Sequence, residues 1–166
     1  MPWLTPDEHT RRVEAARDIV LRRLDRCAAP RAVLARTLER RGVDPHVAKE
    51  ALDRLEAAGV VNDGAYAAAL ARTRFAEKGA ARRAIAEELR LKGVGEGPIR
   101  AALTQVDDED EAAAALALAR RKLAATRGLD PDVRRRRALA LLGRKGYSAP
   151  AAADAVDAAW AEAEGA

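Results

Sequence analysis

The chain has 166 residues, of which 49% are hydrophobic, 34% charged and 3% aromatic. This composition excludes a globally disordered protein, and its alanine-rich, aromatic-poor apolar part suits closely packed helices better than sheets. The single cysteine, Cys27, excludes an internal disulfide, and we expect it to be a buried or partly buried structural thiol. No run of ~18 apolar residues could span a membrane, so a soluble, cytoplasmic protein is expected. The formal charge of +4 permits nucleic-acid contact without demanding it.

Helix signals follow one another along the chain. The stretch 5–8 has the pattern of a capping box with Thr5 as the cap, and the acidic run 107–111 favours a helix N-terminus. Between Gly95 and Pro98 no capping side chain is present, so the helix there should begin late, near Pro98. The predicted helices are 5–27, 30–42, 45–59, 65–78 and 80–92, then one from near Pro98, one from 107–111 to just before Gly128, one from Pro131 and one from Ser148. No useful length of sequence alternates as strands do, so nine helices are predicted.

Three stretches, 38–52, 89–103 and 142–156, repeat one hinge between two helices at intervals of roughly 50 residues. A glycine after a helix adopts the left-handed conformation at little steric cost, and a cation before it faces the negative end of the helix dipole. After the first and third hinges, Asp44 and Ser148 can cap the next helix, as Asp130 can before Pro131. The hinges share the glycines Gly42, Gly93 and Gly146, the leucines Leu38, Leu89 and Leu142, the cations Arg41, Lys92 and Lys145, and the arginines Arg31, Arg82 and Arg135.

The repeated hinge predicts a repeated fold. We predict an all-α protein of three tandem three-helix repeats, at 1–61, 62–106 and 107–166. The connections between repeats are short, so neighbouring repeats should stack in an elongated, curved array rather than form one globular core.

Catalytic and metal-binding chemistry finds little support in the sequence. The two histidines, His9 and His46, are far apart and lack partners at ligand spacing. The glycine-rich stretch 93–97 follows no strand and lacks the lysine of a phosphate-binding loop, and helix capping explains the acidic run at 107–111. We therefore predict a protein that is not an enzyme and that binds no cofactor or metal.

The basic columns allow two interpretations. Arg31, Arg82 and Arg135 each stand ten residues before the cation of the hinge, which places the two charges roughly 80° apart, on one side of a helix. Stacked repeats could then present a basic stripe to a partner, and side chains such as Arg82 and Lys92 should be exposed. Alternatively, dipole compensation and a solvated surface explain the same residues. The sequence leaves both interpretations open.

The middle of the chain resembles the RecX family, which acts on the RecA recombinase. The stretches that carry this resemblance are LDRLEAAGVVNDGAYAAALARTR (52–74), KGAARRAIAEELRLKGV (78–94) and DPDVRRRRALALLGRKGYS (130–148). The resemblance covers about residues 15 to 160, with one departure at Asn62, where the family often has an acid. It implies a regulator that lodges in the groove of a RecA filament on single-stranded DNA and curbs ATP hydrolysis, filament extension and strand exchange. We also expect the protein to be a monomer.

The family pattern fixes no contact residues, so the candidate partner-binding residues come from the basic columns and from the fourth helix. They are Arg31, Arg41, Arg72, Arg74, Arg82, Lys92, Arg135 and Lys145. Two other functions remain open. Three-helix units with tight turns also resemble helix-turn-helix modules that contact DNA directly, if only weakly, and a helical scaffold could serve another protein partner.

Overall fold

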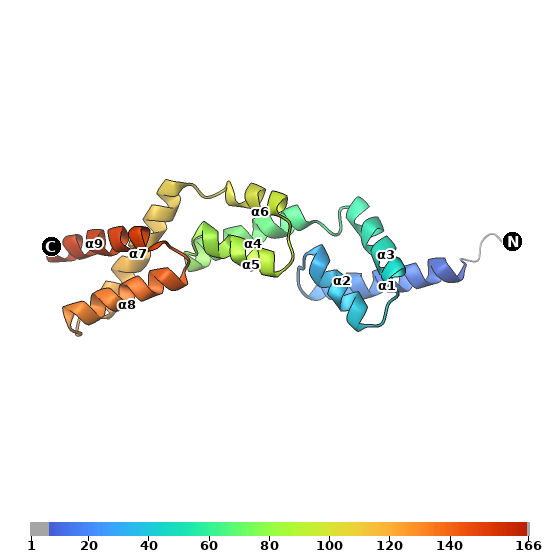
Figure 1. Cartoon of the computed structure of the whole chain (residues 1–166), viewed down its shortest axis with the longest axis horizontal. Coiled ribbons are helices and arrows are strands. Elements are labelled where there is room, and N and C mark those ends of the chain that lie inside the picture. Colours follow the sequence, from blue (N-terminus) through green and yellow to red (C-terminus); the bar gives the residue numbers. More distant parts are fainter. Residues whose placement is uncertain (1–6, 166) are drawn as a thin grey trace. The chain divides into compact units, whose positions relative to one another are not determined.

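The structure is a computed structural model that describes residues 7–165, and in this range it has nine α-helices and no strand (Figure 1). The predicted all-α class and number of helices are thereby confirmed. The helices are α1 (Glu8–Arg26), α2 (Arg31–Arg40), α3 (Pro45–Ala57), α4 (Asp63–Lys78), α5 (Arg82–Leu91), α6 (Glu96–Leu103), α7 (Asp108–Ala125), α8 (Pro131–Arg144) and α9 (Ala149–Glu164).

Most predicted helix starts are confirmed by their caps. Asp44, Asp130 and Ser148 each accept a hydrogen bond from a backbone N–H in the first turn of the following helix. Asp107 and Asp110 form a reciprocal capping box at the start of α7. Local side-chain chemistry therefore sets these helix ends, as the sequence indicated.

The predicted starts of four helices are wrong: α4 begins at Asp63 rather than at 65, α5 begins at Arg82 rather than at 80, and α1 and α6 differ as well. Helix α1 begins at Glu8, because Asp7 rather than Thr5 is its N-cap; Thr5 lies outside the described residues. The Asp7 carboxylate accepts the Thr10 N–H at 2.7 Å, and this hydrogen bond lowers its pKa. Helix α6 begins at Glu96, with Pro98 in its first turn, where the first four N–H groups have no helical acceptor and a missing one costs nothing.

The three hinges end their helices in the same way. In each, the residue after the glycine donates its N–H to the carbonyl of the leucine four residues before the glycine, at 3.0–3.1 Å, which is the Schellman pattern. The glycines Gly42, Gly93 and Gly146 have φ values of 73°, 84° and 92°, and the leucines Leu38, Leu89 and Leu142 are 0% exposed. The repeated hinge is thus one capping motif, with a buried leucine, used three times.

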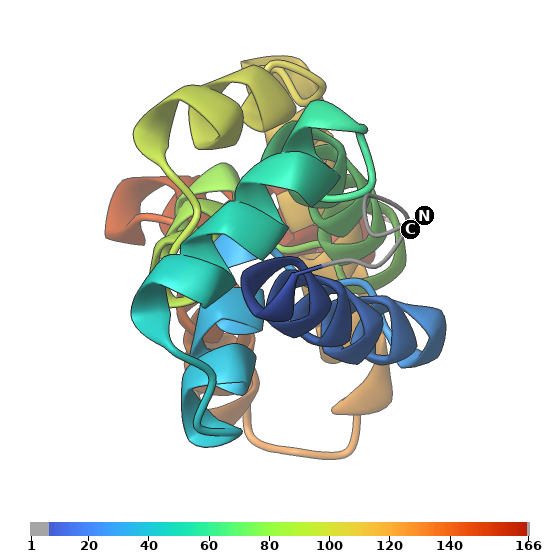
Figure 2. The same cartoon turned by 90° about the vertical axis from the view of Figure 1, so that its right-hand side faces the viewer.

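The described chain divides into two compact units. The first contains the residues up to Ala67 together with Leu89–Ile99. Its α1, α2 and α3 pack on one another, and Figure 2 shows α1 and α3 crossing. Their shared core is aliphatic and holds fully buried side chains such as Val13, Leu34 and Leu55.

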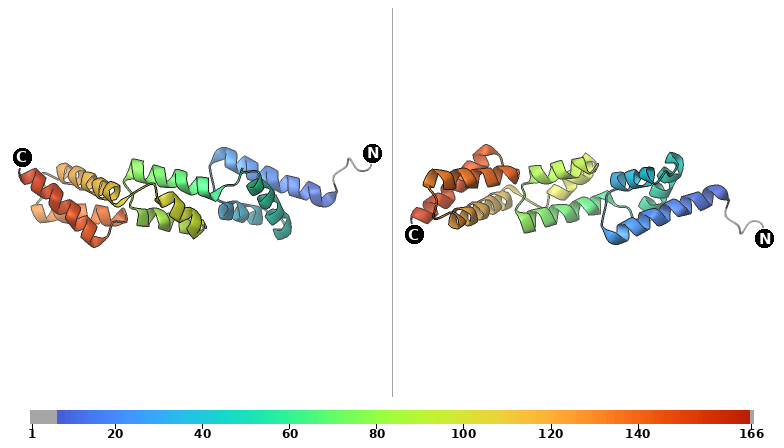
Figure 3. Two further views of the ribbon diagram at one scale, coloured as in Figure 1. Left: turned by 90° about the horizontal axis from the view of Figure 1, so that it is seen from above. Right: turned by 90° about the horizontal axis from the view of Figure 1, so that it is seen from below.

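The second unit contains Ala68–Glu88 and the chain from Arg100 onward. Helices α7, α8 and α9 lie together in both views of Figure 3, and their core is dominated by alanine, with Leu142, Val156 and Tyr147 among the larger members. The repeat boundaries predicted from sequence do not coincide with these units and stay a prediction.

Two hinge glycines also lie against a helix of the preceding repeat. A Cβ atom on Gly93 would stand 2.5 Å from the Cβ of Ala32 in α2, and one on Gly146 would stand 2.5 Å from the Cβ of Ala84 in α5. Gly42 has no atom within 4 Å of such a Cβ. Two hinges therefore require glycine for close packing as well as for positive φ, and the first requires it for φ alone.

This difference makes a matched test. Gly42→Ala should cost about 1 kcal/mol, because it places an L-residue in the left-handed region without any clash. Gly93→Ala should cost clearly more, because the added methyl group overlaps Ala32. Urea unfolding followed by circular dichroism would measure both. Gly97→Ala, within α6 and with open space around it, should be neutral or stabilising. Equal losses for Gly42→Ala and Gly93→Ala would contradict the packing.

Candidate partner-binding surface

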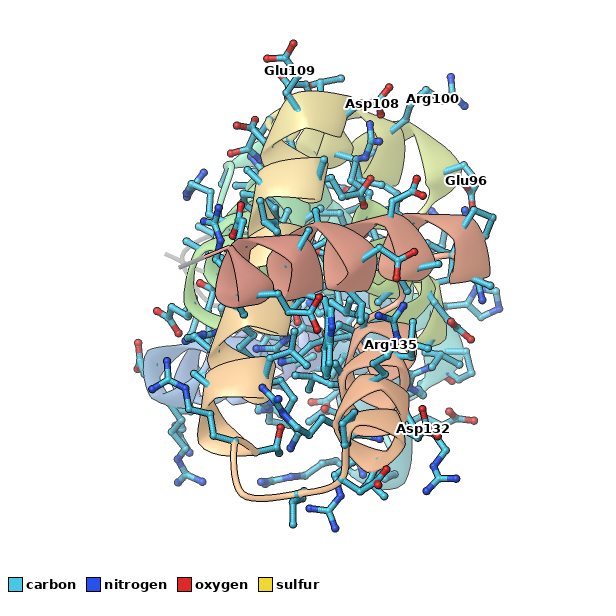
Figure 4. The ribbon with its side chains drawn as sticks, turned by 90° about the vertical axis from the view of Figure 1, so that its left-hand side faces the viewer. Glu96, Arg100, Asp108, Glu109, Asp132 and Arg135 are labelled. Carbon is cyan, nitrogen blue, oxygen red and sulfur yellow. The ribbon has the colours of Figure 1, made fainter. Side chains whose placement is uncertain are left out.

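The arginine column on the second helix of each repeat is ion-paired within the fold. In the first repeat, the Arg31 guanidinium binds Asp53 at 2.6 Å and Glu56 at 2.9 Å, both on α3, and its side chain is 26% exposed. In the third repeat, Arg135 pairs with Asp157 of α9, and Figure 4 shows Arg135 between α8 and α9. Its guanidinium also lies 5.4 Å from the centre of the Trp160 ring, a cation–π distance.

Arg82 has the densest set of partners. Its guanidinium binds Asp108 and, at 2.8 Å, Glu111, and its backbone N–H donates to the other Glu111 oxygen at 2.7 Å. The hydrogen bonds that it donates to Glu111 and, with a smaller effect, to Asp108 raise the pKa of this guanidinium further above its already high value. Its side chain is 32% exposed, so the expectation that Arg82 is exposed is wrong. The acids that bury it lie on α7 and are distant in sequence.

One interaction in this set occurs at two junctions. The N–H of Arg31, the first residue of α2, donates to Asp63 at 2.8 Å, just as the N–H of Arg82 donates to Glu111. Asp63 and Glu111 both lie in the first turn of the first helix of the next repeat. Each acid caps a helix end that lacks a capping side chain of its own. Local sequence patterns do not indicate this contact, because the capping acid lies 32 residues after Arg31 and 29 residues after Arg82.

Two further hydrogen bonds stabilise the second unit near the hinge at Gly146. The Ala81 N–H donates to the Lys145 carbonyl at 2.8 Å, and the Tyr147 hydroxyl donates to the Gly79 carbonyl at 2.8 Å. Burial, with a smaller contribution from the Glu111 charge, raises the pKa of Tyr147 to about 12. Pro30 occupies the position in the first repeat that Ala81 occupies in the second. It has no N–H to donate, so it cannot form the hydrogen bond that Ala81 forms.

The remaining candidates differ in how far their charge is engaged. Arg74 binds Glu88 through two hydrogen bonds of 2.7 Å, whereas Arg72 has only a 3.5 Å contact with Gln105. Arg41 is exposed, and Lys92 is half-buried rather than exposed as expected; Lys145 is also half-buried. Within residues 7–165, these three hinge cations form no ion pair with an acid.

The part of the chain that the structure describes has no cluster of metal-binding side chains. No three histidine, cysteine, aspartate or glutamate side chains are grouped there to hold a metal. His9 is engaged with Glu50 at 2.6 Å. Cys27 is exposed, so the expectation of a buried or partly buried thiol is wrong; it follows the end of α1, where the chain leaves the helix. None of the described helices is both long and apolar enough to cross a membrane.

The fold is that of an all-α protein built from repeated three-helix domains. Its surface carries two groups of charged side chains: those that form ion pairs within the described fold and those that do not. Family models describe residues 62–103 as the second three-helix domain of RecX and residues 108–156 as the third. The chain belongs to the RecX family, whose members are named regulatory proteins.

Relatives and solved structures agree with this assignment. The chain is 48% identical to regulatory protein RecX of Streptomyces coelicolor over 82% of its own length and 72% of the relative's, and 46% identical to that of Thermobifida fusca over 81% and 72%. A crystal structure of regulatory protein RecX matches 84% of this chain and 69% of its own, with a TM-score of 0.73 and 26% identity. RecX from Lactobacillus salivarius matches 91% and 96% with a TM-score of 0.75; at 18% identity it shows the fold alone.

The contact between Arg82 and Glu111 should carry more stability than an exposed pair of the same kind. Glu111→Ala leaves the Arg82 N–H and guanidinium without this partner in a part-buried site, and we expect a loss of about 2 kcal/mol. Glu162→Ala removes an equally bidentate pair with Arg120, but both side chains there are about half exposed, so the loss should be clearly smaller than for Glu111→Ala. Urea unfolding of both variants measures the difference, and a larger loss for Glu162→Ala would show that the junction is not stabilised by Glu111.

Tyr147 should make stability depend on alkaline pH. Its folded-state pKa lies above the unfolded value of about 10, so its contribution is fully present below pH 10 and is lost as the pH rises towards about 12. Tyr147→Phe should be less stable than the parent at pH 8, because the Gly79 carbonyl loses its donor. Between pH 10 and 12 the parent should lose its advantage by up to about 1.4 kcal/mol per pH unit. A pH-independent difference would mean that Tyr147 is not buried.

Proposed function

We propose that this protein binds the RecA filament on single-stranded DNA and inhibits its ATPase activity, its extension and strand exchange. The observation that carries the proposal is family membership, with 48% identity over 82% of the chain to a protein named as a regulator. The proposed partner follows from what the family resemblance implies. A cytoplasmic, monomeric protein without catalytic activity is part of the same proposal.

The described surface suits binding by many modest contacts rather than by one deep site. Repeated units can each contribute a weak contact, and simultaneous engagement then gives affinity that no single contact provides. Arg41, Arg72 and Lys92 are the better candidates among the predicted residues, because no acid in the described chain neutralises them. Arg31, Arg82 and Arg135 already serve the fold, so a change at these positions would test stability together with binding.

The direct test is the single-stranded-DNA-dependent ATPase of RecA, titrated with this protein. We expect inhibition at less than one molecule per RecA protomer, because one repeat array can contact neighbouring protomers. Arg41→Glu with Lys92→Glu should weaken the inhibition several-fold while the circular dichroism spectrum stays unchanged, since neither side chain forms an ion pair in the described fold.

Excess DNA provides the control for this assay. If the filament is the preferred target, raising the single-stranded DNA concentration should relieve the inhibition only in part, because naked DNA competes less well than the filament. Complete relief at a small excess of DNA would show that the protein only sequesters DNA, as the helix-turn-helix alternative requires. Unchanged hydrolysis at equimolar protein would overturn the proposal.

A further inference from the structure

A hollow of about 440 Å³ in the second unit is surrounded by cations. Three helices that are far apart in sequence contribute to it, namely the end of α4, the second half of α7 and the end of α8. Its basic side chains are Lys78, Arg121, Lys122 and Lys145, and Leu118, Ala125 and Leu141 form its apolar part. Glu77 is the single acid of the lining.

The four cations of this basic hollow form no ion pair with an acid within the described chain, whereas Arg120, next to Arg121 on α7, binds Glu162 through two hydrogen bonds of 2.6 and 2.7 Å. Other surface cations are also unpaired. What distinguishes the hollow is that four such cations line one concavity and present their charge to solvent together.

The acids of α7 lie too far away to neutralise the hollow. They occupy 107–111, and Figure 4 shows Asp108 and Glu109 at that end of the helix. The nearest pair, Glu111 and Arg121, is separated by about 15 Å along the helix axis at the usual rise per residue. This distance is nearly twice the Debye length of about 8 Å at physiological ionic strength. The acids of α7 therefore neutralise little of the charge of the hollow.

Helix dipoles explain only part of this charge. Lys78 ends α4 and Lys145 caps α8, so each faces a helix C-terminus that carries about −0.5 of a charge. Lys122 lies in the last turn of α7, which adds a third such terminus. The four cations carry a charge of +4, and the three termini together with Glu77 would still leave the hollow with a charge of roughly +1.5. The carbonyls at these ends also have donors already, such as the Gly79 N–H on Phe75 and the Tyr147 N–H on Leu142. The side-chain cations are thus available to a ligand.

We propose that this basic hollow binds the phosphates of a single-stranded DNA backbone. Its lining has no neutral hydrogen-bonding side chain that could read a base edge, so recognition rests on charge and is independent of sequence. Arg121 can hold a phosphate through two hydrogen bonds, and the lysines act as point charges. The choice of single-stranded DNA as the polyanion rests on the proposed function, which places the protein on a DNA-bound filament.

Naked DNA without RecA tests this site separately from the regulatory function. The anisotropy of a fluorescent oligo-dT strand would be measured against the full-length protein over a series of salt concentrations. Arg121→Gln with Lys122→Gln should weaken binding about tenfold or more and reduce the slope of log affinity against log salt by about 1.4, since each lost phosphate contact removes about 0.7. The matched control is Arg22→Gln with Arg26→Gln on α1, which removes the same charge from two exposed side chains and should leave binding close to that of the parent.

Several outcomes would overturn the site. Equal losses in both double variants would show that binding follows net charge alone, and unchanged binding in both would show that DNA does not use the hollow. A hollow variant that keeps naked-DNA binding but no longer binds the RecA filament would show that the hollow faces protein. Ten millimolar phosphate should displace the strand no better than chloride of equal ionic strength; stronger displacement would assign the hollow to a free phosphate. Each of these outcomes concerns the hollow only, because inhibition of RecA by the parent protein is tested separately in the ATPase assay.

Discussion

Helix packing at the hinge glycines is the constraint on which the rest of the structure depends. At Gly93 and Gly146 the backbone has positive φ and lies so close to an alanine of the preceding repeat that a side chain would overlap it. The Schellman hydrogen bonds fix the buried leucine that lies four residues before each glycine. The same turn sets the direction of the next helix. A hinge with a larger residue would lose both the turn and the close approach, so glycine and alanine at these positions determine how successive repeats pack.

Ion pairing within the fold divides the charged residues into two groups, those with a partner in the described chain and those without one. Asp63 and Glu111 cap the helices that begin at Arg31 and Arg82, and the acids of α3, α7 and α9 take up the arginine side chains. The arginine column therefore stabilises the fold. The sequence pattern alone was equally consistent with these arginines binding a partner. What remains for binding are cations that form no ion pair in the described chain, among them Arg72, those at the hinges of the first two repeats and those around the basic hollow. Function in this account uses the charges that the fold leaves unpaired.

Much of the fold could be predicted because its signals are local. The hinge glycines, the N-caps Asp44, Asp130 and Ser148, and the capping box at Asp107 all act within about four residues of their own position. The candidate site was harder because its partners are distant in sequence: Arg82 meets Glu111 across 29 residues. Lys78, Arg121 and Lys145 meet only when three helices fold together. Of the predicted contact residues, Lys145 alone belongs to the basic hollow, and periodicity within one helix could not have added the others.

Amide hydrogen exchange at the first residues of α2 and α5 tests most directly the claim that acids of the next repeat dock these helices. The first amides of a helix usually lack an acceptor and exchange rapidly. If Asp63 and Glu111 hold them, the amides of Arg31 and Arg82 should be protected and should exchange only when the surrounding unit opens. The amide of Glu8, at the same position of α1, should exchange much faster. Exchange at Arg31 and Arg82 as fast as at Glu8 would contradict the account.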